Sequence, residues 1–280
     1  LRRLVAERQG PPVAGRRART LAILSGKGGV GKTNLGVNLA LLLGQAGKRV
    51  ILLDADFGLA NVDVLFDVDP PFTIQHVLAG EKEVADCLVP VAEGVRLLPG
   101  VSGVARLANL ETSERMRLLE RFSTLEDDAD FLILDTGAGV GDNVIQMAAM
   151  ADMVMILTVP EPTAITDAYA CVKLLARLEL PARLGMVVNM VANRPEAQRV
   201  VDGLIGVTKR FLGVEPEYWG YVLRDAHVQV AVKRRRPFVL EYPRCPAAVC
   251  LRRIVPRLIE SSAGVAGGEG LFGRLSSWFR

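Results

Sequence analysis

The chain has 280 residues, of which 50% are hydrophobic and 23% charged, and its formal net charge is only +3. This composition fits a globular protein with a substantial core, and the overall charge does not call for nucleic acid. Widely spaced cysteines without a Cys-x-x-Cys pair argue against a disulfide framework, and the lack of an apolar run of ~18 residues argues against a membrane span, so we expect a cytoplasmic protein.

Residues 1–19 carry six arginines around a Gly-Pro-Pro turn and have no sustained hydrophobic period. We expect a mobile basic tail there. Because the first residue is Leu1 and not Met, we also expect that an upstream element is missing. From residue 20 to residue 260, short apolar runs alternate with segments of helical period, which is typical of βαβ units.

The expected elements follow one another as a doubly wound α/β fold, with helices on both faces of a mostly parallel sheet. Most of the expected strands are continuous apolar runs, as in strands that are covered on both faces. The strands are expected at 21–24, 50–53, 95–98, 131–134, 153–158, 184–189 and 218–222. The helices are expected at 34–45, 114–125, 143–149, 165–178, 198–212 and 247–259.

Residues 26–33 read G-K-G-G-V-G-K-T and match the phosphate-binding pattern G-x-x-x-x-G-K-[ST] between the first expected strand and helix. The glycines let backbone N–H groups converge on phosphate oxygens, Lys32 neutralises the β and γ phosphates, and the Thr33 hydroxyl ligates Mg²⁺. We therefore predict binding of ATP or ADP with Mg²⁺. The expected nucleotide contacts are Gly26, Lys27, Gly28, Gly29, Val30, Gly31, Lys32, Thr33 and Asn34.

The second lysine of this segment, Lys27, directly follows the first glycine. The segment thereby resembles the deviant Walker A box, K-G-G-x-G-K-[ST], of the MinD/ParA class of P-loop ATPases. In that class the extra lysine reaches the nucleotide of the partner subunit. The resemblance implies a homodimer with ATP and a catalytic role in trans for Lys27, beside Lys32 in cis.

Two acidic segments follow the expected strands at 50–53 and 131–134, and the carboxyl ends of parallel strands share the sheet edge of the P-loop. The resemblance implies that Asp56 orients the attacking water, that Asp135 holds the Mg²⁺ shell and that Gly139 senses the γ-phosphate. It also implies that Asn189 contacts adenine. The alternatives are that Asp54 and Asp56 are strand-end or helix-capping acids, and that Asn189 is a turn residue.

Within the class, residues 54–65, 135–139 and 160–169 look like the FlhG family, also called FleN or YlxH, which regulates the number and placement of bacterial flagella. The resemblance implies slow, dimerisation-coupled ATP hydrolysis. It also implies three partners: the GTPase FlhF, proteins of the flagellar C-ring and a flagellar transcription regulator. Of the family's N-terminal Asp-Gln-Ala-x-x-Leu-Arg motif only Leu1 and Arg2 match, so we expect no stimulation of FlhF by this chain.

Residues 261–270 are small and glycine-rich and predict a flexible linker. In residues 271–280, L-F-G-R-L-S-S-W-F-R, the five large apolar side chains fall within an arc of about 120° on a helix. Members of the FlhG family bind the anionic inner membrane through such a helix when ATP drives dimerisation, and we expect the same here. The alternative is a last helix that docks onto the protein's own core, against which the linker argues.

The main competing interpretation is a ParA-type partitioning ATPase that binds DNA non-specifically as an ATP dimer. Lys233 and the three arginines after it, together with the tail, would then contact phosphates. Such runs are more often solvated surface, so DNA is not the expected partner. The isolated His76 and His227 are expected to be structural.

Overall fold

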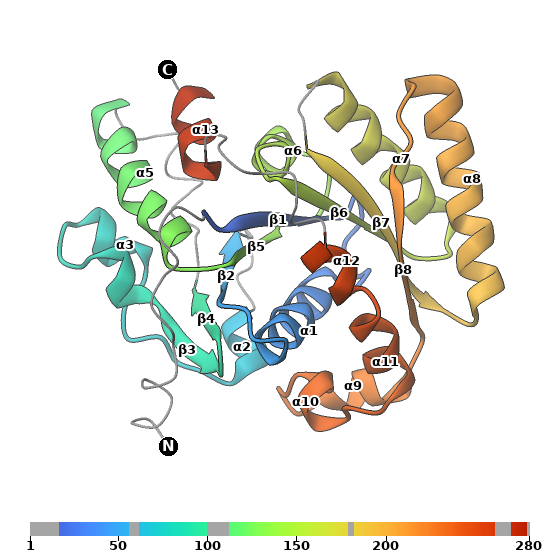
Figure 1. The fold of residues 1–280 in the computed structure, drawn as a ribbon, viewed down its shortest axis with the longest axis horizontal. Helices are drawn as coiled ribbons and strands as arrows, with labels where there is room; N and C mark the ends of the chain where they lie inside the picture. Colours follow the sequence, from blue (N-terminus) through green and yellow to red (C-terminus); the bar gives the residue numbers. More distant parts are fainter. Residues whose placement is uncertain (1–16, 56–61, 100–111, 179–181, 261–269, 279–280) are drawn as a thin grey trace.

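The computed structural model describes residues 17–55, 62–99, 112–178, 182–260 and 270–278. One eight-stranded sheet crosses the molecule in the order β3-β4-β2-β5-β1-β6-β7-β8 (Figure 1). All neighbouring pairs are parallel except β3 with β4. The strands are β1 (Arg19–Leu24), β2 (Val50–Ala55), β3 (Val89–Ala92), β4 (Val95–Leu98), β5 (Phe131–Thr136), β6 (Met153–Thr158), β7 (Arg183–Val191) and β8 (Glu217–Leu223).

Helices cover both faces of the sheet. One face carries α5 (Thr112–Asp127), α6 (Asp142–Ala149), α7 (Pro162–Arg177) and α8 (Arg194–Leu212). The other carries α1 (Lys32–Gln45), α10 (Phe238–Glu241), α11 (Pro246–Arg252) and α12 (Val255–Glu260). Shorter elements are α2 (Val62–Phe66), α3 (Ile74–Leu78), a 3₁₀ turn (Val84–Cys87) and α9 (Ala226–Lys233). The expected doubly wound fold is confirmed.

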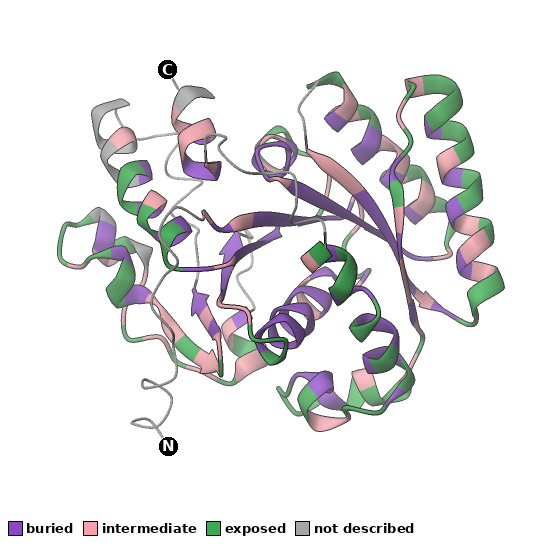
Figure 2. Cartoon of the chain, in the orientation of Figure 1, coloured by how far each residue is buried: buried purple, intermediate pink, exposed green. Residues whose placement is uncertain are grey.

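The central strands are buried on both sides, which is why their sequences are continuous apolar runs and not alternating ones (Figure 2). Within β1, Ala22 and Leu24 pack on the face of α5 to α8, whereas Leu21 and Ile23 pack on the face of α1. The two cores are therefore separated by the sheet, and its carboxyl edge remains the place where loops from several strands meet.

All seven expected strands are present, and β3 is the strand that the sequence did not predict. It is short, half-buried and interrupted by Pro90, and proline is tolerated on an edge strand. The expected helix at 247–259 is two helices, α11 and α12. No helix in the described part of the chain is long and apolar enough to cross a membrane.

Candidate functional site

The loop between β1 and α1 has the backbone shape that its glycines were expected to provide. Gly29 and Gly31 have φ angles of 79° and 90°, in the left-handed region that favours glycine. A Cβ at Gly26 would overlap the backbone of Asp167 in α7, so this glycine lets α7 approach the loop closely. The space over Gly29 is open, because a Cβ there would meet no atom within 4 Å. The loop is therefore a shaped and accessible turn at the start of α1.

The signature lysine of the loop, Lys32, forms a buried ion pair across the sheet edge. Its Nζ lies 3.0 Å from Oδ1 of Asp135 at the end of β5, and the two side chains are only 7% and 1% exposed. β1 and β5 are neighbouring parallel strands, and this pairing brings the two charges together. Each charge compensates the other in a place where neither would be stable alone.

The second lysine, Lys27, points to α7. Its Nζ contacts Oε2 of Glu161 at 2.8 Å and Oγ1 of Thr163 at 3.3 Å. The side chains of Lys27 and Glu161 are 40% and 55% exposed, and the lysine lowers the pKa of the Glu161 carboxyl through its hydrogen bond and its charge. An exposed ion pair is weak and exchanges readily with water, so Lys27 is held only loosely in this position.

The acidic segment after β2 is described as far as Ala55. Asp54 is buried, and its Oδ2 accepts a hydrogen bond from the N–H of Val62 at the start of α2, at 3.1 Å. This contact supports the alternative of a helix-capping role for Asp54. Asp56, the expected catalytic acid, lies outside the described residues.

The segment after β5 contacts the P-loop through its backbone. The N–H of Gly139 donates to the carbonyl oxygen of Ser25 at 2.9 Å, and Gly139 has a φ of 107°. Just before this segment, at the end of β5, the Thr136 hydroxyl donates to the carbonyl oxygen of Ile23 at 2.8 Å. The expected γ-phosphate sensor is therefore joined directly to the loop that would hold the phosphates.

Asn189 lies near the end of β7 and is buried against the P-loop. Its Nδ2 donates to the carbonyl oxygen of Val30 at 2.8 Å, and its Oδ1 accepts from the N–H of Met190 at 2.9 Å. A Cβ at Gly31 would overlap the amide of Asn189. In this structure the amide therefore holds the loop and the strand end together. Asn34, on the first turn of α1, accepts a hydrogen bond from Asn38.

The residues around the loop fit a magnesium nucleotide. The positive charge of Lys32 and the hydroxyl of the half-buried Thr33 lie at the start of α1, where helical N–H groups favour a negative ligand. Asp135 offers the carboxylate oxygens that Mg²⁺ prefers. Elsewhere in the described residues, no group of three or more His, Cys, Asp or Glu is placed to hold a metal ion.

The last described helix, α13 (Leu271–Trp278), is docked onto the protein. Leu271, Phe272 and Leu275 are buried with the core of the α5 to α8 face. The ring of Phe272 stacks on that of Phe122 in α5, with centroids 5.4 Å apart. The structure thus has the docked alternative, although the glycine-rich segment before the helix favoured a free one. Residues 261–269 of the linker expected at 261–270, and Phe279, lie outside the described residues.

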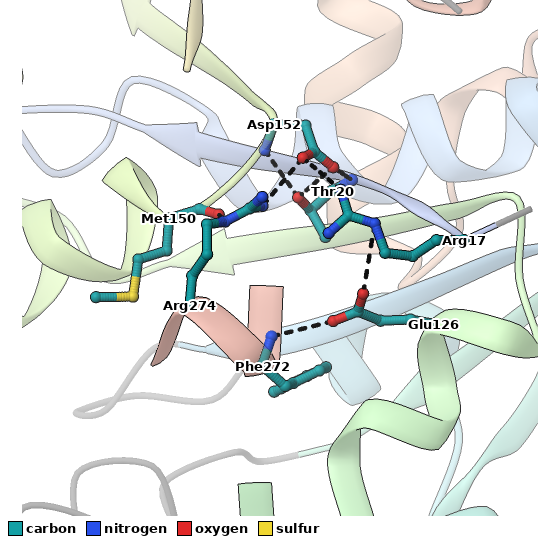
Figure 3. A network of polar contacts seen from close by, with 7 residues as sticks. All are labelled: Arg17, Thr20, Glu126, Met150, Asp152, Phe272 and Arg274. Carbon is teal, nitrogen blue, oxygen red and sulfur yellow. Dashed lines mark hydrogen bonds and ion pairs between the residues drawn. The ribbon is translucent and has the colours of Figure 1, made fainter. Parts of the chain in front are cut away.

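Polar contacts hold the first turn of the docked helix (Figure 3). Oε1 of Glu126 in α5 accepts the N–H of Phe272 at 3.0 Å. Arg274 donates through Nε to the carbonyl oxygen of Met150 at 2.7 Å and through Nη2 to Oδ1 of Asp152 at 3.0 Å. The same Oδ1 accepts from Nη2 of Arg17 at 2.9 Å.

The two acids of this network are buried. Oδ2 of Asp152 accepts hydrogen bonds from the N–H and the hydroxyl of Thr20 in β1, both at 2.9 Å. Burial raises the pKa of the Glu126 carboxyl, and the Phe272 N–H and the charges of Arg17 and Arg274 offset this only in part. A Cβ at Gly270 would overlap the Glu126 carboxylate, so glycine allows the chain to approach it.

No sequence pattern predicted this network. Asp152 stands alone before an apolar strand, Glu126 ends a charged helix, and neither belongs to a motif. Distances between residues so far apart in the chain become visible only in the folded molecule.

The basic run at the end of α9 is partly neutralised within the chain. Arg234 donates to Oε1 of Glu241 at 2.8 Å, and Nη1 of Arg235 lies 3.7 Å from Oδ1 of Asp67. The two histidines take part in local helix-end contacts: Nδ1 of His76 accepts from the N–H of Thr73, and Nδ1 of His227 lies 2.8 Å from Oδ1 of Asp225. The run is thus partly paired within the chain, and both histidines make local contacts next to a helix.

Comparison with known proteins also identifies nearly the whole chain as a P-loop NTPase. A ParA family model, described as NUBPL iron-transfer P-loop NTPase, matches residues 16–259. The chain is 40% identical over 240 residues to the antiactivator FleN of Pseudomonas aeruginosa, covering 86% of each. It is 36% identical over 217 residues to the flagellum site-determining protein YlxH of Helicobacter pylori, covering 77% of this chain and 73% of that protein.

Among solved structures, the cell division ATPase MinD of Pyrococcus furiosus superposes with a TM-score of 0.71 at 25% identity. The match covers 88% of this chain and 100% of that one. The fold, the phosphate-binding loop and the sequence relatives therefore all point to the same family.

Proposed function

This chain belongs to the FlhG (FleN/YlxH) family of MinD/ParA-type P-loop ATPases, and from that premise we propose that it is a nucleotide-switched homodimer that regulates flagellar number and placement at the inner membrane. The names of its relatives, an antiactivator and a flagellum site-determining protein, support the biological role. FlhF, C-ring proteins and a flagellar transcription regulator are the partners included in this proposal. The protein is cytoplasmic in this scheme and joins the membrane peripherally in the ATP state.

In the proposed ATP state, the P-loop amides and Lys32 bind the phosphates, while Thr33 and Asp135 hold Mg²⁺. The metal supplies charge neutralisation at the phosphates. In the buried ion pair, Asp135 compensates the charge of Lys32 and Lys32 compensates the charge of Asp135. In the proposed ATP state, Lys32 would exchange Asp135 for the phosphates and Asp135 would exchange Lys32 for the metal, so both charges would stay compensated. Asp56 is the proposed water-orienting acid, Gly139 the proposed γ-phosphate contact, and Asn189 the proposed adenine contact.

Lys27 is the proposed link between the two subunits. It lies at the P-loop but is directed to Glu161 and Thr163, not to its own Lys32 and Asp135 pair. Because this ion pair is exposed, its loss costs little, and the ammonium group is available for the phosphates of a facing subunit. Closure of two ATP-bound subunits would then place one Lys27 in each nucleotide site.

The docked α13 is the proposed resting state of the membrane anchor. The apolar face of Leu271, Phe272 and Leu275 cannot be buried against α5 and in a bilayer at the same time. Membrane binding therefore requires that α13 leaves the protein surface. One short helix binds a bilayer weakly, whereas a dimer that presents two gains avidity, which couples ATP-driven dimerisation to membrane residence.

The observation that supports the proposal best concerns α13. It is an amphipathic helix whose apolar face is buried against the protein, in a chain that also has a complete deviant Walker A loop. The test is co-sedimentation with anionic liposomes in ATP and in ADP. The intact chain is compared with a chain that ends at Gly270 and with a full-length Leu275→Glu variant. We expect ATP-dependent pelleting of the intact chain only.

Pelleting of all three proteins would contradict a role for α13, and pelleting of none would contradict the membrane proposal. In the second case the DNA-binding alternative is tested by retention on DNA in ATP, with charge reversal at Lys233 and Arg236. Retention that disappears on charge reversal would favour the partitioning function.

A further inference from the structure

One polar side chain lies inside the apolar part of α1. Residues 35–43 of this helix are buried, and apart from Asn38 they are glycine, alanine, valine or leucine. Asn38 itself is only 1% exposed. Asparagine is unfavourable in the middle of a helix, and a buried amide is costly unless it is hydrogen-bonded. Its position therefore calls for partners at both ends of the amide.

The oxygen end of the Asn38 amide holds α10. Its Oδ1 accepts a hydrogen bond from the N–H of Val239 at 2.9 Å, inside the protein. Val239 is the second residue of α10, and Pro237 before that helix provides no side-chain cap. The first N–H groups of a helix have no partner within the helix. Asn38 thus satisfies one of them and joins α1 to α10.

The nitrogen end of the Asn38 amide reaches back to the first turn of α1. Its Nδ2 donates to the backbone carbonyl oxygen of Asn34 at 2.7 Å and to Oδ1 of Asn34 at 2.9 Å. Asn34 directly follows Thr33, the last residue of the P-loop motif, and is half-buried. The network therefore runs from α10 through Asn38 to the phosphate-binding loop.

Backbone groups fix the orientation of both amides. A backbone N–H can only donate and a backbone carbonyl can only accept, so Val239 must face the oxygen of Asn38, and the carbonyl of Asn34 must face its nitrogen. Because that nitrogen also meets the side chain of Asn34, the atom that it meets there must be the oxygen. The NH₂ group of Asn34 is therefore the end directed away from Asn38, and within the described ranges it makes no hydrogen bond.

We propose that Asn38 is a positioning residue of the nucleotide site: it holds the amide oxygen of Asn34 and so presents the NH₂ group of Asn34 to a phosphate oxygen of ATP or ADP. The inference rests on the proposed nucleotide binding and adds a residue that the P-loop motif does not include. The start of α1 favours negative charge, and an NH₂ donor there adds to that preference. The opposite orientation of Asn34 would present a carbonyl oxygen, which repels phosphate. The hydrogen bond from Asn38 prevents that orientation.

The test is a double-variant cycle on nucleotide affinity, measured by isothermal titration of the full-length chain with Mg-ADP. Asn34→Ala and Asn38→Ala are each expected to weaken binding roughly tenfold, because a hydrogen bond to a charged group is lost or is no longer held in place. The double variant should bind as weakly as Asn34→Ala alone, since Asn38 acts only through Asn34. Additive losses, or an unchanged affinity in Asn38→Ala, would overturn the proposal.

The matched control is Phe238→Leu. Phe238 is 3% exposed and belongs to the core between α10 and α1, so its replacement loosens that packing but leaves the amide network in place. Thermal unfolding should show a loss of stability in Phe238→Leu and in Asn38→Ala, whereas only Asn38→Ala should lose affinity for ADP. An equal loss of affinity in both variants would mean that Asn38 acts through stability alone.

A second measurement uses the unaltered chain and does not depend on the folding of a variant. The side-chain NH₂ resonances of Asn34 and Asn38 are recorded by NMR with and without Mg-ADP. The resonances of Asn34 should shift more than those of Asn38, and the reverse would overturn the proposal. If the unaltered chain bound no ADP, the proposed function itself would fail. ADP binding that is equally tight in all the variants would refute only the role of Asn38.

Discussion

Arg17, just before the first strand, and Arg274, in the last helix, donate to the same oxygen of Asp152, at 2.9 and 3.0 Å (Figure 3). The beginning and the end of the described chain are thus joined through one buried carboxylate. Any event that moves Arg17 changes the charge balance around Asp152 and with it the contact that holds α13. Arg17 and the proposed membrane helix are therefore coupled through this carboxylate.

Replacing Asp152 with Asn should release α13. The amide keeps one acceptor but loses the charge, and hydrogen bonds to charged groups contribute roughly 1.5–3 kcal/mol each. A loss of about 1.4 kcal/mol increases the undocked fraction about tenfold. Hydrogen exchange in residues 271–278 should accelerate, and liposome binding in ADP should rise. The control is Asp130→Asn, which weakens a similar contact with Arg49 far from α13. If hydrogen exchange in α13 accelerated equally in both variants, Asp152 would not be the residue that holds α13 in place.

Replacing Phe272 with Ala should separate undocking from membrane affinity. The substitution removes the ring that stacks on Phe122, and loss of a buried phenylalanine typically costs about 3–5 kcal/mol. The helix should leave α5, as in Asp152→Asn, but it should bind liposomes more weakly because the bilayer loses the same ring. If Phe272→Ala pelleted as well as Asp152→Asn, the apolar face would not be the membrane contact.

The docking of α13 should depend on pH through Glu126. Its pKa is raised above the ordinary value of 4.5 when α13 is docked, chiefly by burial. The docked state therefore binds the proton more tightly than the undocked one, and raising the pH from 4.5 through the raised pKa should weaken docking. Arg17 and Arg274 face the carboxylate and reduce the effect, and Asp152 adds to it. The rate of hydrogen exchange in α13, measured as a function of pH, reports this dependence of docking on pH.

Glu126→Gln is the matched variant for that experiment. The amide retains an oxygen for the N–H of Phe272 but cannot ionise in this range. In this variant, the protection of α13 from hydrogen exchange should therefore not decrease as the pH rises through the raised pKa of Glu126. Identical pH profiles in both proteins would exclude Glu126 as the titrating group.

Lys27→Ala should abolish ATP-dependent dimerisation while leaving the monomer stable and able to bind nucleotide. Its ion pair with Glu161 is exposed, so its loss has little effect on unfolding. Light scattering after size exclusion in ATP reports the dimer. Glu161→Gln, which removes the cis partner but keeps the lysine, is the control and should still dimerise. A dimer that survives in Lys27→Ala would contradict the trans role.

Lys32→Met should destabilise the nucleotide-free protein as well as impair nucleotide binding. It leaves the carboxylate of Asp135, 1% exposed, without its lysine, and breaking such a buried pair typically costs about 3–5 kcal/mol. Denaturant unfolding without nucleotide measures this loss. The double variant Lys32→Met with Asp135→Leu removes both charges and should recover part of the stability. No recovery would mean that the two charges are not coupled.

The sheet could be predicted from the sequence because strands buried on both faces must be apolar throughout, and this pattern marked most of the seven expected strands. The P-loop could be predicted because the approach of backbone to phosphate requires glycine at fixed spacing. β3 escaped prediction because its four residues are half-buried and contain Pro90, so neither apolar length nor alternation marks it. The helix expected at 247–259 contains Pro256, which has no N–H to donate to the preceding turn, and the structure accordingly ends α11 before it and places Pro256 at the second residue of α12.

The sequence by itself determined the fold class, the nucleotide loop and the amphipathic nature of the last helix, since each depends on residue type and local spacing. Only the tertiary structure decided what covers that helix and where Lys27, Asn189 and Arg17 lie. An apolar face of Leu271, Phe272 and Leu275 suits a bilayer and a neighbouring helix equally well, because hydrophobic burial has no direction. The choice depends on Glu126 and Asp152, which only the folded chain brings within hydrogen-bond distance of α13.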